Sequence, residues 1–275
     1  MNVSELNSIA KAMVSNGKGI LAADESTPTI KKRFDTIGAE STFDTRQRYR
    51  EMLFTTEGLN QYIGGVILFD ETLRQSTTED ILFPKYLSDL GIVPGIKVDA
   101  GAKPLAGYEG ETVTEGLDGL RDRLAEYSNL GAKFAKWRAV IHISESVPSG
   151  FCIKSNAHAL ARYAALCQEI NIVPIVEPEV LMDGTHDISR CEEVTADVLD
   201  VVFSELSDHG VVLEGIVLKP NMVISGSEAL NRADPSEVAE LTLRCLISHV
   251  PKEVPGIAFL SGGQTAEEAT EHLDL

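Results

Sequence analysis

The sequence predicts an α/β protein whose parallel strands close into a (β/α) barrel, and three observations lead to this prediction. Short apolar runs alternate with amphipathic helical stretches along the whole chain, which is typical of parallel sheets built through right-handed crossovers. Charged or polar residues gather where the apolar runs end, at the position where barrels carry their functional groups. No G-x-G-x-x-G pattern follows the first run, so a doubly wound dinucleotide-binding sheet is disfavoured.

The alternation of predicted helices and strands begins with the first segments of the chain. Residues 3–15 carry apolar residues at helical spacing, which predicts a helix that ends at the turn formed by residues 16–19. A short apolar strand with an acidic, polar end follows at 19–26. Further strands are predicted at 65–70, 93–99, 134–141, 172–180, 213–222 and 256–263. Helices are predicted between them, for example at 157–169, 191–208 and 235–249.

These seven strands are one fewer than the eight of a closed TIM barrel. After residue 264 the chain begins a helix with a capping box from Thr265 to Glu268, and it ends at Leu275. We therefore expect a TIM (β/α)8 barrel that forms a single catalytic domain over residues 1–275, with the eighth strand missing after Leu275. The edges of the first and seventh strands would then be unpaired, and such edges invite aggregation or local disorder.

Composition and charge exclude several classes of protein. The chain is 43% hydrophobic and 24% charged, which is ordinary for a globular protein, and its net charge of −18 argues against nucleic-acid binding. No apolar run approaches the roughly 18 residues of a membrane span, and the N-terminus lacks a basic region followed by an apolar one. We expect a cytoplasmic protein that binds neither nucleic acid nor membrane.

The cysteines and histidines form no recognisable metal-binding pattern. Cys152, Cys167, Cys191 and Cys245 contain no C-x-x-C pair, so we expect buried thiols. The six histidines form neither an H-x-H nor an H-E-x-x-H cluster, so no metal site is predicted.

Residues 213–222 bring a lysine to the end of an apolar run. Pro220 cannot donate to a sheet ladder and disfavours helical geometry before it, which places Lys219 as the last residue of a strand. Partial desolvation there would lower the pKa of Lys219 and supply the neutral amine that attacks a carbonyl. The alternative is a lysine that extends from the strand end into solvent.

The ends of two other strands carry paired charges. Lys136 and Arg138 share one face of a strand, and so do Glu177 and Glu179. One interpretation is that these charges form ion pairs that close the top of the barrel. In the functional interpretation, Lys136 favours the neutral amine of Lys219, and the glutamates transfer protons as a carbinolamine forms and loses water.

Three more segments offer functional groups. Asp24, at the first strand end, is a candidate base for a substrate hydroxyl. Residues 260–263 supply a hydroxyl and backbone N–H groups where barrels commonly hold phosphate, although the same residues also fit a plain glycine turn. A second anionic group is expected at a set of residues that also fits a solvated helix start, namely Ser26, Thr29, Lys32, Arg33 and Lys97.

Six motifs, in this order, resemble the class I fructose-bisphosphate aldolase family, and the resemblance runs from near residue 7 to the end. The motifs are GILAADES (19–26), GIKVD (95–99), FAKWR (134–138), IVPIVEPE (172–179), LKPNM (218–222) and LSGGQ (260–264). The resemblance implies a homotetrameric lyase of glycolysis and gluconeogenesis that needs no metal or other cofactor. Such an enzyme cleaves fructose 1,6-bisphosphate reversibly to dihydroxyacetone phosphate and glyceraldehyde 3-phosphate.

The resemblance also implies roles for individual residues. Lys219 matches the Schiff-base lysine, Glu177 the acid and base of dehydration and imine hydrolysis, and Asp24 the group that acts on the C4 hydroxyl. Lys136 matches the lysine beside the imine, and Glu179 the neighbour that orients the lysines. The phosphate-binding matches are Ser261 and Gly262 for the 1-phosphate, Ser26, Lys97 and Arg138 near the 6-phosphate, Thr29 where the family often has serine, and Arg33 as a lining residue.

The resemblance leaves two alternatives open. Family members continue into an eighth strand with a phosphate-binding arginine and, in most cases, a tail with a functional tyrosine, which these 275 residues do not include. We therefore expect this chain alone to be weakly active or inactive. One alternative is therefore a catalytically weak or silent fragment or scaffold of the same fold, although intact Lys219, Glu177 and Asp24 argue against decay of the site. The other is a Schiff-base barrel aldolase for a different phosphorylated sugar. The motifs do not separate fructose 1,6-bisphosphate from fructose 1-phosphate as the preferred substrate.

Overall fold

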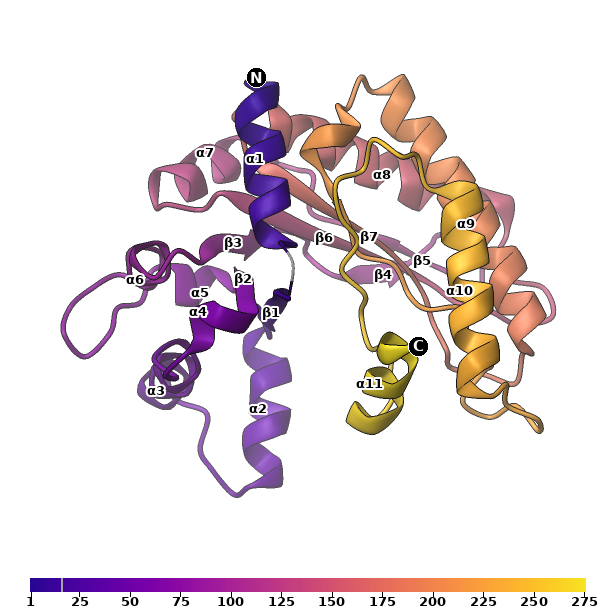
Figure 1. The fold of residues 1–275 in the computed structure, drawn as a ribbon, viewed down its shortest axis with the longest axis horizontal. Helices are drawn as coiled ribbons and strands as arrows, with labels where there is room; N and C mark the ends of the chain where they lie inside the picture. Colours follow the sequence, from indigo (N-terminus) through magenta and orange to yellow (C-terminus); the bar gives the residue numbers. More distant parts are fainter. Residues whose placement is uncertain (16) are drawn as a thin grey trace.

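A curled sheet of six parallel strands forms the centre of the computed structural model, which describes residues 1–15 and 17–275 (Figure 1). Neighbouring strands follow the order β1-β2-β3-β6-β7-β8, and every pair is parallel. The strands are β1 Gly19–Ala23, β2 Ile63–Leu68, β3 Val93–Lys97, β6 Phe134–Ile141, β7 Val173–Val180 and β8 Val217–Leu218. This half-barrel confirms the predicted α/β class and its relation to the TIM barrel.

Helices precede, connect and follow the strands, and the connecting helices cover the outer face of the sheet. They are α1 Val3–Met13, α2 Thr27–Thr36, α3 Phe43–Phe54, α4 Leu59–Tyr62, α5 Asp70–Leu73, α6 Phe83–Asp89, α7 Leu120–Asn129, α8 Gly150–Glu169, α9 Ile188–Asp208, α10 Pro235–His249 and α11 Ala266–Asp274. A short antiparallel pair, β4 Ala102–Pro104 and β5 Thr112–Thr114, follows β3. Within the described residues, no helix has the length and apolar character of a membrane span.

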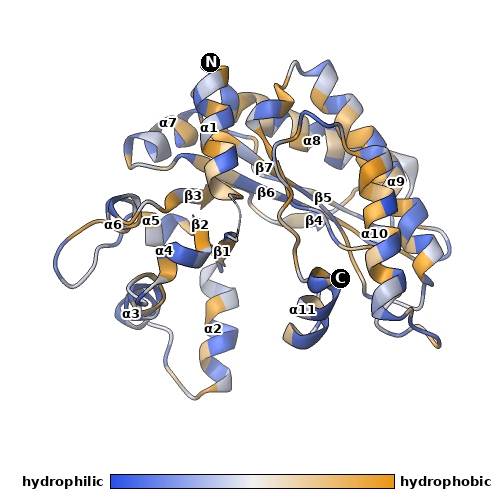
Figure 2. Ribbon diagram, in the orientation of Figure 1, coloured by the Kyte–Doolittle hydropathy of each residue, from blue (hydrophilic) through white to orange (hydrophobic). Residues whose placement is uncertain are grey.

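Two apolar cores hold these layers together. The larger core lies between the sheet and its covering helices, and Figure 2 shows hydrophobic and hydrophilic residues alternating along those helices. On α8, the predicted inward face is confirmed, since Leu160, Tyr163, Ala164 and Cys167 are fully buried. The four cysteines are free and buried, as predicted.

The smaller core fills the inside of the curved sheet. Leu6, Ala10 and Met13 of α1 pack in it with residues near the amino ends of the strands, among them Phe134 and Val173. Gly64 allows this approach, because a Cβ atom there would lie 2.5 Å from the carbonyl oxygen of Met13. Apolar side chains thus occupy the amino-terminal end of the interior and leave the carboxyl ends of the strands to polar groups.

The predicted strand at 256–263 is wrong as a strand, although the segment does run beside β8. It forms a single parallel bridge, between Leu218 and Ile257, and hydrogen bonds such as Ala258 N to Leu218 O at 2.9 Å. A regular strand needs a continued ladder, and this segment turns away at Gly262 and Gly263, where φ is 61° and 96°. Among the described residues, the sheet is therefore open between this segment and β1.

Several predicted boundaries also differ from the structure. The run 213–222 begins as a 3₁₀ turn at Leu213–Gly215, and β8 ends at Leu218, so Lys219 directly follows the strand instead of ending it. β1 ends at Ala23, which places residues 24–26 in the loop behind it. The predicted capping box of α11 is confirmed, since Thr265 and Glu268 exchange both hydrogen bonds. The predicted turn at 16–19 includes Asn16, which lies outside the described residues.

Candidate active site

A cavity of about 680 Å³ opens at the carboxyl ends of the strands. Its lining includes every residue of the predicted site except one. These residues are Asp24, Ser26, Thr29, Arg33, Lys97, Lys136, Arg138, Glu177, Glu179, Lys219, Ser261 and Gly262. The exception is Lys32, an exposed residue of α2 that does not line the cavity.

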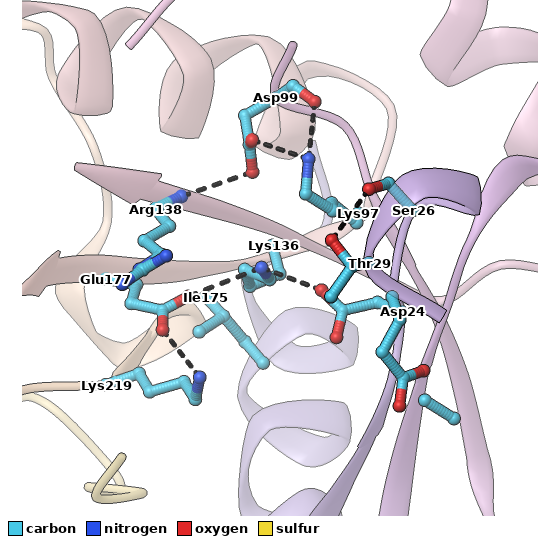
Figure 3. Close-up of polar contacts among 12 residues, drawn as sticks. Asp24, Ser26, Thr29, Lys97, Asp99, Lys136, Arg138, Ile175, Glu177 and Lys219 are labelled. Carbon is cyan, nitrogen blue, oxygen red and sulfur yellow. Dashed lines mark hydrogen bonds and ion pairs between the residues drawn. The ribbon is translucent and has the colours of Figure 1, made fainter. Parts of the chain in front are cut away.

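Lys219 points into this cavity from the loop behind β8 (Figure 3). Its Nζ donates a hydrogen bond to Glu177 Oε1 at 2.6 Å, and its side chain is only 14% exposed, which excludes the solvent-extended alternative. Two hydrogen bonds hold this loop against β7: Lys219 N donates to Val176 O, and the Asn221 side-chain oxygen accepts from Val180 N. β7 therefore positions both the lysine and its carboxylate partner.

Lys136 of β6 lies between two carboxylates. Its Nζ is 2.7 Å from Asp24 Oδ2 and 3.6 Å from Glu177 Oε2. Figure 3 marks both contacts with dashed lines. Burial alone would lower the pKa of Lys136, but the carboxylates of Glu177, Asp24 and Asp99 raise it above its usual value. Lys136 is thus held as a cation at neutral pH.

Asp24 is the ionised partner in this contact. Burial alone would raise the pKa of Asp24, but the charge and hydrogen bond of Lys136, together with the charge of Lys219, hold it below the usual 3.8. The carboxylate can therefore accept a proton or a hydroxyl hydrogen bond at neutral pH.

Glu177 connects the two lysines and keeps one free acceptor. Its Oε1 accepts from Lys219, whereas its Oε2 is buried and has no hydrogen-bond partner among the described residues. The 3.6 Å approach of Lys136 is too long for a hydrogen bond, although it is an ion pair. A buried acceptor without a partner is costly, so this oxygen is available to a ligand hydroxyl or proton.

The cations Arg138 and Lys97 each have a carboxylate partner. Arg138 Nε donates to Glu179 Oε2. The resemblance relates Glu179 to the lysines, whereas here its ion pair is with Arg138. Lys97 Nζ donates to Asp99 Oδ1 at 2.6 Å. Sequence reasoning assigned Asp99 no role, although the i, i+2 spacing from Lys97 would have placed both on one strand face.

The loop behind β1 forms another side of the cavity. Ser26 Oγ and Thr29 Oγ1 lie 3.0 Å apart at the start of α2. Glu25, also unassigned from sequence, pairs with Arg33 at 2.6 Å and with buried Arg50 at 2.9 Å. Arg50 belongs to α3 and shows no pattern in sequence that links it to the loop.

The segment 260–263 lies next to the Lys219 loop. Leu260 N donates to the carbonyl of Pro220 at 3.2 Å, which holds the segment beside that loop. Gly262 and Gly263 adopt positive φ, as a glycine turn requires, and Ser261 is exposed at the cavity. The glycine turn and an anion-binding loop are therefore compatible interpretations of the same residues.

The formal charge of the cavity differs from that of the chain. The lining contains five cations, Arg33, Lys97, Lys136, Arg138 and Lys219, and five carboxylates, Asp24, Glu25, Asp99, Glu177 and Glu179. The whole chain has 24 lysines and arginines against 42 aspartates and glutamates. The cavity is thus locally neutral in a strongly acidic protein, which makes it the region suited to an anionic ligand.

Comparison with known proteins gives a consistent result. A family model described as glycolytic, fructose-bisphosphate aldolase class-I, matches residues 5–275. A protein of Xanthomonas campestris named probable fructose-bisphosphate aldolase class 1 is 60% identical over 274 residues, which are 100% of this chain and 82% of the relative. Cytosolic fructose-bisphosphate aldolase 4 of Arabidopsis thaliana is 53% identical, over 98% of this chain and 69% of its own length.

A solved structure agrees with these relatives. The fructose-bisphosphate aldolase of Plasmodium falciparum, crystallised with TRAP and a small-molecule inhibitor, superposes with a TM-score of 0.97 at 48% identity. The match covers 99% of this chain and 79% of that one. This chain therefore belongs to the class I fructose-bisphosphate aldolase family.

Proposed function

We propose that this protein is a class I aldolase that reversibly cleaves fructose 1,6-bisphosphate to dihydroxyacetone phosphate and glyceraldehyde 3-phosphate through a Schiff base on Lys219. The observation that carries the proposal is the contact of Lys219 Nζ with Glu177 Oε1 at 2.6 Å inside a cavity of balanced charge. A glycolytic role and the lyase class agree with the family.

Glu177 can accept the proton that the Lys219 ammonium must lose before it reacts. A proton passed from the Lys219 ammonium to Glu177 leaves a neutral amine, which attacks the C2 carbonyl to give a carbinolamine. The protonated Glu177 then returns the proton to the departing hydroxyl, so that water leaves and an iminium remains. Lys136, held as a cation nearby, disfavours a second positive charge on Lys219 before the attack.

Asp24 is suited to the cleavage step. It is ionised at neutral pH, so it can accept the proton of the C4 hydroxyl while the C3–C4 bond breaks. The electron pair of that bond moves into the iminium and forms an enamine as the aldehyde leaves. Protonation of the enamine at C3 and hydrolysis of the imine then release the ketone and restore Lys219.

The two phosphates are assigned to opposite sides of the cavity. Ser261 and Gly262 offer a hydroxyl and a backbone N–H to the 1-phosphate. The 6-phosphate is assigned to Ser26, Lys97 and Arg138, with Thr29 and Arg33 lining that side. Glu179 acts here as a positioning residue for Arg138, because the two are ion-paired.

Three further assignments complete the proposal. We propose that the protein is cytoplasmic, like its cytosolic-named relative of Arabidopsis thaliana. We also propose that residues 1–275 act as one catalytic domain and that the protein assembles as a homotetramer, as the sequence resemblance implies.

Trapping of the imine tests this function directly. The protein is incubated with dihydroxyacetone phosphate, reduced with borohydride and analysed by peptide mass spectrometry. The expected result is one adduct on Lys219, with the mass of the ketone less one oxygen atom. Lys219→Arg should give no adduct, whereas Lys32→Arg, on an exposed residue outside the cavity, should label like the parent. Labelling on another lysine, or none in the parent, would overturn the proposal.

A further inference from the structure

We propose that the outer surface of α8 and α9 carries a binding site for a divalent transition-metal ion, formed by His158, Glu205 and His209. Each residue offers one ligand atom, and these atoms all lie within 4.8 Å of one another. His158 belongs to α8, Glu205 to the last turn of α9, and His209 directly follows α9, so no sequence motif indicated the site. The site is separate from the cavity that contains Lys219, since none of its residues lines that cavity.

The two helices present these side chains side by side. Glu205 lies in the last turn of α9 and His209, four residues later, is the C-cap of that helix, so the two share one side of its end. His158 Nδ1 lies 3.0 Å from Glu205 Oε2, and the rings of His158 and His209 are 4.9 Å apart, centre to centre. Glu205 is the least exposed of the three, with 13% of its side chain accessible, which leaves the carboxylate little freedom to move away.

The hydrogen bond of His209 leaves its Nε2 as the nitrogen available to an ion. Its Nδ1 lies 2.8 Å from the carbonyl oxygen of Glu205 and 3.8 Å from Glu205 Oε2, and a carbonyl can only accept, so Nδ1 carries the hydrogen. In the neutral ring the lone pair is then on Nε2. Metal-binding histidines are commonly fixed in this way, with one nitrogen donating to a carbonyl and the other bound to the ion.

The donor set determines the kind of ion. Two imidazoles and one carboxylate suit Zn²⁺ and neighbouring first-row ions, whereas Mg²⁺ and Ca²⁺ prefer oxygen ligands alone. Three protein ligands leave a coordination position for water. The ion would replace the proton shared between His158 and Glu205, so it would convert a hydrogen bond between α8 and α9 into a metal link.

Nearby groups limit the affinity without blocking the site. Arg162, one turn after His158, lines the same groove as His209 and opposes a cation. The free cysteines, which would otherwise compete for zinc, are all buried. We therefore expect one site per chain with a dissociation constant in the micromolar range.

Calorimetry with Zn²⁺ on chelator-treated protein tests the site. The parent should bind one ion per chain, and its melting temperature should rise when zinc is in excess. His158→Gln and His209→Gln should each weaken binding by about tenfold or more, because each removes one of three ligands. Co²⁺ titration followed by visible absorption gives a second readout that does not depend on aldolase activity.

His249→Gln is the matched control. His249 also pairs with a carboxylate, Asp200 at 2.7 Å, but it is not part of the three-residue cluster. This variant should bind zinc like the parent. The proposal is wrong if the parent binds no zinc at a concentration about 100-fold above the expected dissociation constant. It is also wrong if all three histidine variants bind zinc equally well.

Discussion

Replacement of Lys136 by methionine should destabilise the protein strongly, because it leaves carboxylates buried without their cation. Lys136 is 5% exposed and contacts Asp24 at 2.7 Å and Glu177 at 3.6 Å. Removal of one member of a buried ion pair typically costs about 3–5 kcal/mol. Methionine keeps most of the side-chain volume, so a cavity contributes little to the loss.

The pH dependence of the loss identifies its cause. In the parent, the pKa of Asp24 is lowered below 3.8, so Asp24 adds stability above that pH and loses it as the pH falls through the folded-state value. In Lys136→Met, burial outweighs the remaining attraction of Lys219, and the pKa of folded Asp24 should rise above 3.8. The variant then has a lower free energy of unfolding than the parent at neutral pH, and this difference should shrink as the pH falls toward 4.

Urea unfolding at several pH values measures both effects. Lys31→Met is the control, because Lys31 pairs with Asp35 at 2.8 Å on the surface, where the two side chains are 60% and 56% exposed. Such a pair contributes less than about 1 kcal/mol. Adding Asp24→Asn to Lys136→Met should recover part of the loss. A loss below about 1 kcal/mol for Lys136→Met, or one independent of pH, would refute the reasoning.

Two further substitutions test the strand packing and the anion side of the cavity. Gly95→Ala should cost about 1–3 kcal/mol in urea unfolding, because its Cβ would lie 2.3 Å from the Phe134 ring. Gly19→Ala, which would meet no atom within 4 Å, should cost much less; equal losses would contradict this account. Asp99→Asn removes the carboxylate that competes with phosphate for Lys97. It should lower the dissociation constant for fructose 1,6-bisphosphate in calorimetry by about tenfold, or ~1.4 kcal/mol. An unchanged constant would mean that Lys97 does not contact the substrate.

The residues that line the cavity could be predicted from sequence because strand periodicity and strand direction act locally. Lys136 and Arg138 are two residues apart, so any strand there puts them on one face, and the structure directs both into the cavity. Pro220 ends the pairing of β8 and leaves Lys219 directly behind the strand. Parallel pairing then brings all the carboxyl ends together, without any need to know the tertiary contacts in advance.

Features that depend on distant partners could not be predicted in this way. α8 begins at Gly150, earlier than its apolar pattern, because Ser149 caps it and Glu111 accepts from Ser149 N and Oγ. Glu111 lies next to β5 and has no periodic relation to the helix. The prediction of a strand at 256–263 was wrong for a related reason. Its apolar composition resembles a strand, but within residues 1–15 and 17–275 it forms only one bridge, with Leu218 of β8.

The pairing of charges in the cavity bears on how an anionic substrate would bind. Each of the five lining cations already has a carboxylate within ion-pair distance in the described residues: Arg33 with Glu25, Lys97 with Asp99, Lys136 with Asp24, Arg138 with Glu179 and Lys219 with Glu177. A phosphate therefore competes with a protein carboxylate for each cation that it contacts. The pairs keep the cations in place and avoid uncompensated buried charge before the substrate arrives. The same pairs reduce the net attraction for phosphate, so the backbone N–H groups and hydroxyls, which have no such competitor, should contribute more to phosphate selectivity than the charge count suggests.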